Sequence, residues 1–495
     1  MIGSDRRDMV LVRKTRMFGL TRAPDLVGPE QLWFNVERPL SLADLRGKLV
    51  ILDFWTFCCV NCLHTLPTLA ALEARFPDEV VVIGVHCPKF DHERDPRMVA
   101  QAIARHGIGH PVVHDPDLRL WDAYCVHAWP TLVLIAPDGR VIGQLSGEPH
   151  PDLLPEGIAE MVDRFAAQGR LRPGARHRPP AALAEPGRRL RFPAKIRRGL
   201  AGTWVVADCG HHQVVLFGDD GCERARFGGG EAGWRDGADP LFNGPEGVAS
   251  DGRHLYVADT RNHVIRRLDP GSGETVTLAG QGWRGGTLGA AVPGPEVALA
   301  SPWDVEVAGE NLYFANAGSH QLGRLDLRSG MVSALAGCGA ESLQDGVGTG
   351  CVLAQPSGLA LCDDGDALYF ADAESSALRR LCLDSHRVET LVGHGLFDFG
   401  HRNGPVAEAR LQHPLALAVA GGRIFVADSY NQAVRVVDPV SGQVSDLGAM
   451  TDAVGLGEPA GVATDGPWRL LLSDTNNHRI LEMDLRAGTI RPWVV

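Results

Sequence analysis

A short segment recurs six times in the C-terminal two-thirds of this 495-residue chain, and the repetition constrains the fold more than any other feature. Each copy is an apolar run that ends in Asp or Asn, followed by a polar turn and a second apolar run. The six anchor residues are Asp208, Asp259, Asn316, Asp372, Asp428 and Asp474, with successive spacings of 51, 57, 56, 56 and 46 residues. A unit of this size cannot bury its own faces, so it must stack on its neighbours.

The rest of each unit completes a four-stranded pattern. Five anchors follow a second recurring piece that starts with proline, as in Pro245-Glu-Gly-Val-Ala, and a tight turn such as Asp251-Gly252 separates the two pieces. Four short strands in such a unit form one blade, and radial stacking of the blades makes a β-propeller. The repeats therefore predict an all-β, six-bladed propeller over residues 191–495.

Two further expectations concern the loops of this propeller. The connections between blades are long, as at 280–301 and 393–413, and an up-and-down topology places them on one face. Long loops of this kind commonly bind ligands, so we expect a protein partner at the loop face. The anchor side chain is expected to close an Asx turn on the backbone two residues later, with a ring of metal-binding Asp residues as the alternative.

Residues 21–170 show a different pattern, in which strand and helix signals alternate. The runs Leu49–Phe54 and Val80–His86 are apolar and strand-like, whereas 153–167 has the spacing of an amphipathic helix. This alternation predicts an α/β domain around a central sheet. The predicted domains are a basic N-terminal extension at 1–20, the α/β domain at 21–170, a basic, Pro- and Arg-rich linker at 171–190, and the propeller at 191–495.

The composition argues against several functional classes. The net charge is −12, and an acidic protein does not suit nucleic acid, whose backbone requires a basic face. No run of 18 or more apolar residues occurs, so no transmembrane helix or membrane partner is expected. The first 20 residues lack the apolar core of a secretory signal, which predicts a cytoplasmic location. Histidines show no repeated metal-ligand spacing, and we expect neither a metal nor an organic cofactor.

The α/β domain carries two cysteines in an order typical of redox proteins. The run Leu49–Phe54 leads into Cys59-Val60-Asn61-Cys62, and a helix-compatible stretch follows. Amides at the start of a helix stabilise a thiolate, and a second thiol one turn later can resolve a mixed disulfide. This order predicts a redox centre with Cys59 as the nucleophile and Cys62 as the resolving thiol, which together form a redox-active disulfide.

Two other polar side chains are candidates for the same site. Asp53 lies six residues before Cys59 on the incoming strand, where burial would raise its pKa and let it accept the proton of Cys62. Alternatively, local hydrogen bonds satisfy Asp53 and it has no catalytic part. His86 ends the neighbouring strand and could reach the dithiol, although a histidine unrelated to the site is the simpler interpretation.

These residues resemble a known active site. The run Asp-Phe-Trp-x-x-Cys-Cys-x-x-Cys at 53–62, with Pro67 after it, resembles the active-site segment of thioredoxin. Trp129-Pro130-Thr131 is similar to the cis-proline loop of that family, which packs against the dithiol and binds the substrate backbone. The resemblance implies a site made of Cys59, Cys62, Asp53 and Pro130, supported by Trp55, Cys58, Trp129, Pro67 and His86.

The combination of this segment with six repeats is more specific. The sequence Cys58-Cys59-Val60-Asn61-Cys62 ahead of six propeller units resembles the family of NHL repeat-containing protein 2 and its bacterial relatives, over about residues 25–495. The resemblance implies a thioredoxin-like fold followed by a six-bladed NHL-repeat β-propeller. Val60-Asn61 replaces the Gly-Pro usual in thioredoxin. Cys58 replaces an aromatic residue, so a third thiol lies at the site, either as an apolar filler or as an alternative disulfide partner.

Three functions are compatible with this sequence. The working hypothesis is a thiol–disulfide oxidoreductase whose propeller holds a partner or substrate; it would act on protein thiols or disulfides and need an unknown reductant. The second is a non-enzymatic scaffold or redox-sensing interaction protein, because a fold alone does not fix a function. The third is a thiol peroxidase, suggested by Thr56 three residues before Cys59, although Leu52 stands where that motif requires proline.

Overall fold

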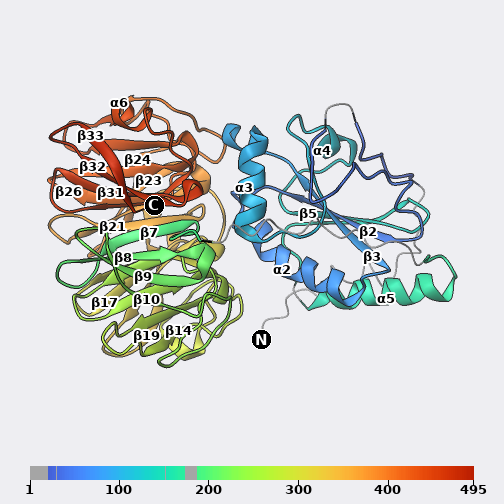
Figure 1. The fold of residues 1–495 in the computed structure, drawn as a ribbon, viewed down its shortest axis with the longest axis horizontal. Helices are drawn as coiled ribbons and strands as arrows, with labels where there is room; N and C mark the ends of the chain where they lie inside the picture. The colour runs from blue at the N-terminus through green and yellow to red at the C-terminus, as the bar shows by residue number, and fades with distance from the viewer. Residues whose placement is uncertain (1–20, 29–30, 151, 173–186, 495) are drawn as a thin grey trace. The chain divides into compact units, whose positions relative to one another are not determined.

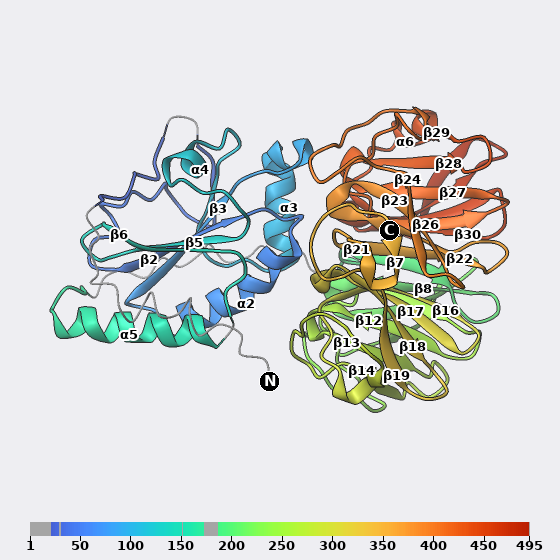
Figure 2. The same cartoon turned by 180° about the vertical axis from the view of Figure 1, so that it is seen from behind.

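A computed structural model describes residues 21–28, 31–150, 152–172 and 187–494. The predicted N-terminal extension, 1–20, and residues 173–186 of the predicted linker lie outside the described residues. The chain divides into two compact units, residues 1–184 and 185–495 (Figure 1 and Figure 2). The first unit is α/β with a thioredoxin-like fold and the second is a six-bladed propeller, so the predicted fold class is confirmed.

The N-terminal unit is built on one six-stranded sheet. Its strands are β1 (Trp33–Phe34), β2 (Leu49–Trp55), β3 (Val80–His86), β4 (Val112–His114), β5 (Thr131–Ile135) and β6 (Val141–Ser146). They lie in the order β1-β4-β3-β2-β5-β6, with β2, β3 and β4 parallel and β5 antiparallel to β2. The central strand β2 is buried along its whole length, which explains its continuous apolar sequence.

Helices pack against this sheet and fix the end of β2 relative to the helix that follows it. The helices are α2 (Val60–Arg75), α3 (Pro96–His106), α4 (Arg119–Ala123) and α5 (Leu153–Ala167), with the 3-10 turn η1 (Asp91–Arg94). Alternate residues of β2 point to two cores. Leu49 and Ile51 pack with α2 and α5, whereas Leu52 and Phe54 pack with Tyr124, which follows α4. Figure 1 shows α2 and α5 on the same side of the sheet.

Each propeller blade is a meander of four antiparallel strands. The first strands of neighbouring blades contact one another in a closed ring, so they are the innermost. Three short strands, β15 (Val292–Pro293), β20 (Gly346–Val347) and β25 (Gly404–Pro405), pair with the outer strands of blades 3, 4 and 5. A short helix, α6 (Gly448–Thr451), follows blade 5. The blades are, in chain order, β7 (Pro193–Arg198), β8 (Thr203–Asp208), β9 (Gln213–Gly218) and β10 (Glu223–Phe227); β11 (Gly247–Ser250), β12 (Leu255–Asp259), β13 (Val264–Leu268) and β14 (Thr275–Ala279); β16 (Pro302–Ala308), β17 (Asn311–Asn316), β18 (Gln321–Asp326) and β19 (Met331–Ala336); β21 (Pro356–Leu361), β22 (Ala367–Asp372), β23 (Ala377–Cys382) and β24 (Arg387–Val392); β26 (Ala416–Ala420), β27 (Arg423–Asp428), β28 (Ala433–Asp438) and β29 (Gln443–Asp446); and β30 (Pro459–Thr464), β31 (Arg469–Asp474), β32 (Arg479–Asp484) and β33 (Thr489–Val494).

The ring closes without exchanging a strand between the first and last blades. Blade 1 takes all four of its strands from the start of the propeller and blade 6 takes all four from its end. Trp204 and Phe217 of blade 1 share a buried cluster with Leu471 and Ile480 of blade 6. The two terminal blades are therefore joined by contacts between them, hydrophobic packing included, and not by a shared strand.

The six anchor residues are fully buried and structural, but not in the predicted way. Each accepts, through Oδ1, a hydrogen bond of 2.6–2.9 Å from a backbone amide 16–18 residues earlier, in the connection that enters the same blade. In blade 2, Asn243 N donates to Asp259, and Arg266 Nη1 donates to its second oxygen at 3.2 Å. The expected Asx turn is therefore wrong. The anchor ends the second strand facing the incoming connection, so its Oδ1 bonds that distant segment. Asp259, Asp428 and Asp474 also bond their own turns, but through the side chain of an asparagine three residues later and not through a backbone amide.

The histidines of the repeat join neighbouring blades. His212, His263, His320 and His478 follow the turn after the second strand with φ of 52–58°. Each Nδ1 accepts a hydrogen bond of 3.0–3.1 Å from the backbone amide that opens the next blade, and His478 makes this bond across the ring closure. A histidine that accepts through Nδ1 carries no proton on that atom, so this hydrogen bond requires a neutral ring. We call the bond between the histidine and the amide of the next blade a histidine clip.

Candidate active site

The dithiol lies between β2 and α2, as the sequence predicts. β2 ends at Trp55 and Cys59 caps α2, its carbonyl accepting the amides of Cys62 at 3.1 Å and Leu63 at 3.2 Å. Cys59 is partly exposed and Cys62 is fully buried; both are free thiols, and they share a hydrogen bond. Pro67 is exposed, farther along the same helix. The accessible thiol therefore lies at the N-terminal amides of a 16-residue helix.

Asp53 is the buried carboxylate of this site. It is fully buried in β2, and neither of its oxygens has a hydrogen-bond partner in the part of the chain that the structure describes. Burial raises its pKa to about 7. Burial also raises the pKa of the Cys62 thiol well above its ordinary value, and the hydrogen bond with Cys59, the charge of Cys59 and that of Asp53 add to the increase. The alternative interpretation, a carboxylate satisfied by local hydrogen bonds, does not describe Asp53.

The sheet register brings the predicted proline loop to the same end of β2. The Trp129–Pro130 peptide bond is cis, and the next residue, Thr131, begins β5. Thr131 pairs with Phe54, so Pro130 lies beside the end of β2 from which the turn to the dithiol starts. Trp129 donates from Nε1 to the carbonyl of Cys87 at 3.1 Å, which ties this loop to the end of β3.

His86 is buried behind this turn among aromatic rings. It is the parallel partner of Trp55, stacks on Phe57 with 5.4 Å between ring centroids, and lies 3.1 Å from His114 Nδ1 through its own Nδ1. His114 Nε2 lies 3.1 Å from the Arg94 carbonyl, which can only accept, so His86 supplies the Nδ1 proton of the pair. Burial, and then His114, lower the pKa of His86 well below its ordinary value. Within the described residues, no hydrogen bond joins His86 to Asp53 or to Cys62, so it supports the packing of the turn.

Glu93 is a residue of this site that the sequence did not reveal. It lies on η1 and is fully buried. Its Oε1 accepts the Thr56 hydroxyl at 2.6 Å and the Cys58 amide at 3.1 Å, and its Oε2 accepts the amides of Lys89 at 2.8 Å and Phe90 at 3.0 Å. Glu93 stands in a charge-rich stretch that resembles an exposed turn, and its separation of 35 residues from Cys58 gives no local signal.

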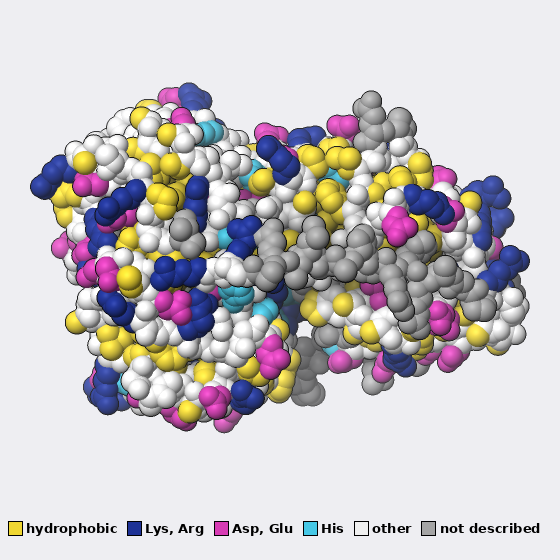
Figure 3. Space-filling model, in the orientation of Figure 1, with side chains coloured by type: hydrophobic (Ala, Val, Ile, Leu, Met, Phe, Trp, Pro, Cys, Tyr) yellow, Lys and Arg dark blue, Asp and Glu magenta, His cyan; other side chains and the backbone are white. Residues whose placement is uncertain are grey.

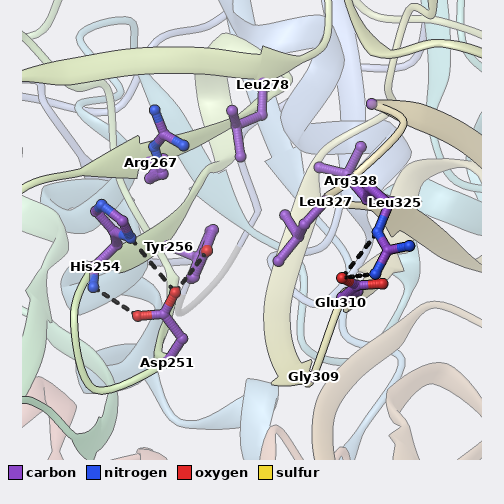
Figure 4. A pocket seen from close by; sticks show the side chains of 11 residues that line it. Asp251, His254, Tyr256, Arg267, Leu278, Gly309, Glu310, Leu325, Leu327 and Arg328 are labelled. Atoms are coloured by element: carbon purple, nitrogen blue, oxygen red, sulfur yellow. Dashed lines mark hydrogen bonds and ion pairs between the residues drawn. The ribbon is translucent and has the colours of Figure 1, made fainter.

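The propeller offers a groove on a face other than the predicted loop face. A groove of about 370 Å³ lies between blades 2 and 3, at the tight turns that connect the first two strands of each blade (Figure 4). On one wall Asp251 accepts a hydrogen bond from the Tyr256 hydroxyl, and on the other Glu310 forms an ion pair with Arg328. Each of these polar groups therefore bonds a residue of its own wall. Figure 3 shows basic and acidic side chains interspersed over the propeller face in view. The predicted partner site at the loop face stays a prediction.

Comparisons with known proteins agree with the two-unit architecture. A thioredoxin-like family model matches residues 47–141, which include the dithiol, Asp53 and Pro130, and the NHL repeat model matches residues 242–268 of blade 2. Within the described residues, every helix is too short or too polar to cross a bilayer.

Two of the similar proteins extend over nearly the whole chain. NHL repeat-containing protein 2 of Bos taurus is 36% identical over 514 residues, which cover 94% of this chain and 71% of that protein. Protein SUPPRESSOR OF QUENCHING 1, chloroplastic, of Arabidopsis thaliana is 36% identical over 489 residues, which cover 92% of this chain but 46% of that protein, so the chain spans less than half of this relative. Thiol-disulfide oxidoreductase YkuV of Bacillus subtilis is 30% identical over 102 residues, 20% of this chain and 67% of that protein.

Proposed function

The chain belongs to the family of NHL repeat-containing protein 2, and from this premise we propose that it is a thiol–disulfide oxidoreductase that acts through Cys59 and Cys62. One observation carries the proposal. A partly exposed thiol at a helix N-terminus lies next to a buried thiol, and the buried carboxylate behind them has no hydrogen-bond partner among the described residues. The likeness of the N-terminal unit to a thiol–disulfide oxidoreductase adds support.

In the first step, the Cys59 thiolate attacks one sulfur of a substrate disulfide. A Cys59–substrate disulfide forms, the substrate S–S bond breaks, and the second substrate sulfur leaves as a thiolate that takes a proton from water. The amides at the start of α2 favour the attacking thiolate. Pro130, which lies beside the end of β2, would contact the backbone of the bound substrate.

In the second step, Cys62 resolves the mixed disulfide. Its proton passes to Asp53, and its sulfur attacks Cys59 Sγ, which releases the substrate thiolate and forms the Cys59–Cys62 disulfide. Two electrons have then moved from the dithiol to the substrate. Asp53 suits the part of base because a pKa of about 7 lets it accept a proton near neutral pH and release it again. An external dithiol reductant, whose identity is open, would reset the pair; no other cofactor is needed.

The propeller is the proposed platform for a protein partner or substrate, and a cytoplasmic location remains a prediction from the sequence. Propellers present their loops on rigid blades, and such loops commonly bind. The scaffold hypothesis differs from the enzymatic one in a direct way: a scaffold retains its partner without Cys59. Capture of partners by Cys62→Ser, which leaves the mixed disulfide unresolved, but not by Cys59→Ser, supports the enzyme.

The enzymatic proposal is tested by turnover with a dithiol reductant. Wild-type protein is expected to accelerate the reduction of insulin disulfides, and Cys59→Ser is expected to lose this activity completely because no nucleophile remains. Cys125→Ser, which removes an exposed thiol of the same unit, is the matched control and should keep full activity. Equal rates for wild type and Cys59→Ser would reject the proposal. The thiol peroxidase alternative predicts peroxide consumption faster than that of a free thiol.

A further inference from the structure

Two adjacent cysteines precede the resolving thiol, so the structure must determine which of them reacts and forms the disulfide with Cys62. Cys58 and Cys59 are neighbours in the turn after β2, and neither forms a disulfide. Cys58 is 1% exposed, whereas Cys59 is partly exposed. Either sulfur could in principle pair with Cys62 if the turn were mobile. The surroundings of Cys58 therefore decide which disulfide forms.

Glu93 holds this turn through hydrogen bonds that only a carboxylate can accept together. The Thr56 hydroxyl and the Cys58 amide donate to Oε1, and the amides of Lys89 and Phe90 donate to Oε2. All four partners are donors, so both oxygens must act as acceptors. A glutamine would direct its NH₂ group at two of these donors and leave them unbonded.

The same carboxylate fixes the proton of the Cys58 thiol through Thr56. A threonine hydroxyl has one hydrogen, and the 2.6 Å bond to Glu93 uses it. The Thr56 oxygen can then only accept, and the group that lies 3.8 Å from it is Cys58 Sγ. Cys58 must therefore carry its own hydrogen in this arrangement. A thiolate at this position would face the lone pairs of Thr56 and, behind them, the negative charge of Glu93.

We propose that Glu93, acting through Thr56 and the Cys58 amide, is the positioning residue that selects Cys59 as the reactive thiol and withholds Cys58 from the redox pair. The inference deepens the proposed function, on which it rests for the choice of Cys59 as nucleophile. Cys59 lies at the N-terminal end of α2, the end of a helix dipole that favours a negative charge, while the Glu93 network opposes a Cys58 thiolate. The two neighbouring sulfurs are thus placed in opposite electrostatic surroundings.

The test maps which cysteine reacts. Reduced full-length protein is treated with one equivalent of methyl methanethiosulfonate, which transfers a methylthio group to a thiolate and releases methanesulfinate. Peptide mass spectrometry then gives the share of label and of disulfide at each cysteine. In wild type, Cys59 should take the label and its disulfide with Cys62 should follow. In Glu93→Gln, the share of Cys58 should rise about tenfold, the change expected when a hydrogen bond to a charged group is lost.

Matched variants separate this network from general destabilisation. Thr56→Val removes the hydroxyl and should raise the share of Cys58 in the same direction, whereas Thr56→Ser keeps the hydroxyl and should react as wild type. Asp115→Asn alters another buried carboxylate of the same unit, which accepts the amides of Leu120 and Trp121. It should leave the share of Cys58 unchanged even if it lowers the melting temperature.

The outcomes distinguish this inference from the proposed function. A folded Glu93→Gln or Thr56→Val protein that keeps the wild-type share of label at Cys58 overturns the inference, whatever its activity. If Glu93→Gln fails to fold, Thr56→Val, a substitution of similar volume, decides. A wild-type protein whose Cys59 takes no label counts against the proposed function instead, and a higher share of label at Cys58 in the two variants would still support the role of Glu93.

Discussion

Buried carboxylates occur in both units of this chain, but their surroundings differ. In the propeller, three buried carboxylates each accept a hydrogen bond from a backbone amide and form an ion pair with a fully buried arginine; they belong to Asp259, Asp372 and Asp428. In the thioredoxin-like unit, Asp53 has neither within the described residues, and burial raises its pKa to about 7. A paired carboxylate supports the fold, whereas an unpartnered one raises the free energy of the folded state and is ready to exchange a proton.

Glu93 shows that this difference is local and does not simply follow the boundary between the units. It belongs to the same unit as Asp53, yet it accepts four hydrogen bonds, one more than Asp259 accepts in the propeller. Its proposed part is accordingly to position a turn and not to move a proton. The number of donors around a buried carboxylate thus separates structural groups from reactive ones better than burial itself does.

The largest expected effect comes from breaking a buried ion pair of the propeller. Arg266→Met should destabilise the propeller by about 3–5 kcal/mol, because Asp259, whose pKa burial already raises to about 6, then loses its counter-ion and must stay charged without it or take up a proton. Arg267→Met, at the adjacent and exposed position of β13, is the matched control and should stay within about 0.5 kcal/mol of wild type. Urea unfolding monitored by hydrogen exchange over residues 255–268 measures both. Equal losses in the two variants would show that the buried pair has no special weight.

Removing the charge of Asp53, the carboxylate without a partner among the described residues, should change stability in the opposite direction. Asp53→Asn should stabilise the N-terminal unit at pH 8, by about 2–4 kcal/mol, because the folded wild type must hold a desolvated charge there. The folded pKa of about 7 lies above the unfolded value of about 3.9. Wild type therefore loses stability as pH rises from about 4 to 7, and its difference from Asp53→Asn should vanish below about pH 4. Unfolding of both proteins from pH 4 to 8 checks this; a less stable Asp53→Asn at pH 8 would mean that Asp53 has a partner.

Asp53→Asn, which should stabilise the fold, should also slow the resolution of the mixed disulfide. Reaction with the disulfide DTNB releases one thiolate when the mixed disulfide forms and a second when Cys62 resolves it, so two phases report the two steps. Asp53→Asn should slow the second phase about 10²-fold and leave the first unchanged. In wild type, the second phase should slow as pH falls below about 7, because Asp53 becomes protonated. Subtracting the signal of Cys59→Ser removes the exposed cysteines. An unchanged second phase in Asp53→Asn would assign the proton to another acceptor.

The sequence was sufficient where the signal is local or repeated. Six anchors at regular spacing predicted the propeller, and the strand, the dithiol and the helix predicted the position of Cys59 because they are contiguous in the chain. It failed where function depends on distant donors. The partners of the anchors come from 16–18 residues upstream, and Glu93 reaches Cys58 across 35 residues. Such contacts are set by the register of strands and by the path of loops, neither of which leaves a pattern in composition or periodicity.

The smallest expected effect concerns the histidine clips between blades, which resemble the anchors in being paired. His212 Nδ1 accepts the Gly244 amide at 3.0 Å, and burial, followed by the neighbouring arginines, lowers the His212 pKa to about 4. Because the unfolded ring titrates near 6.5, the propeller should lose stability as pH falls from about 6.5 to 4. His212→Asn offers an acceptor at the same distance from the backbone and tolerates φ of 57°.

This variant should therefore keep the clip but not its pH dependence. Between pH 7 and 4.5, wild type should lose about 1 kcal/mol more than His212→Asn, a value reduced by the partial exposure of the ring to solvent. The other three histidine clips are present in both proteins, so their contributions cancel in the difference. Urea midpoints at the two pH values measure the effect. Parallel losses in the two proteins would place the acid sensitivity of the propeller in groups other than His212.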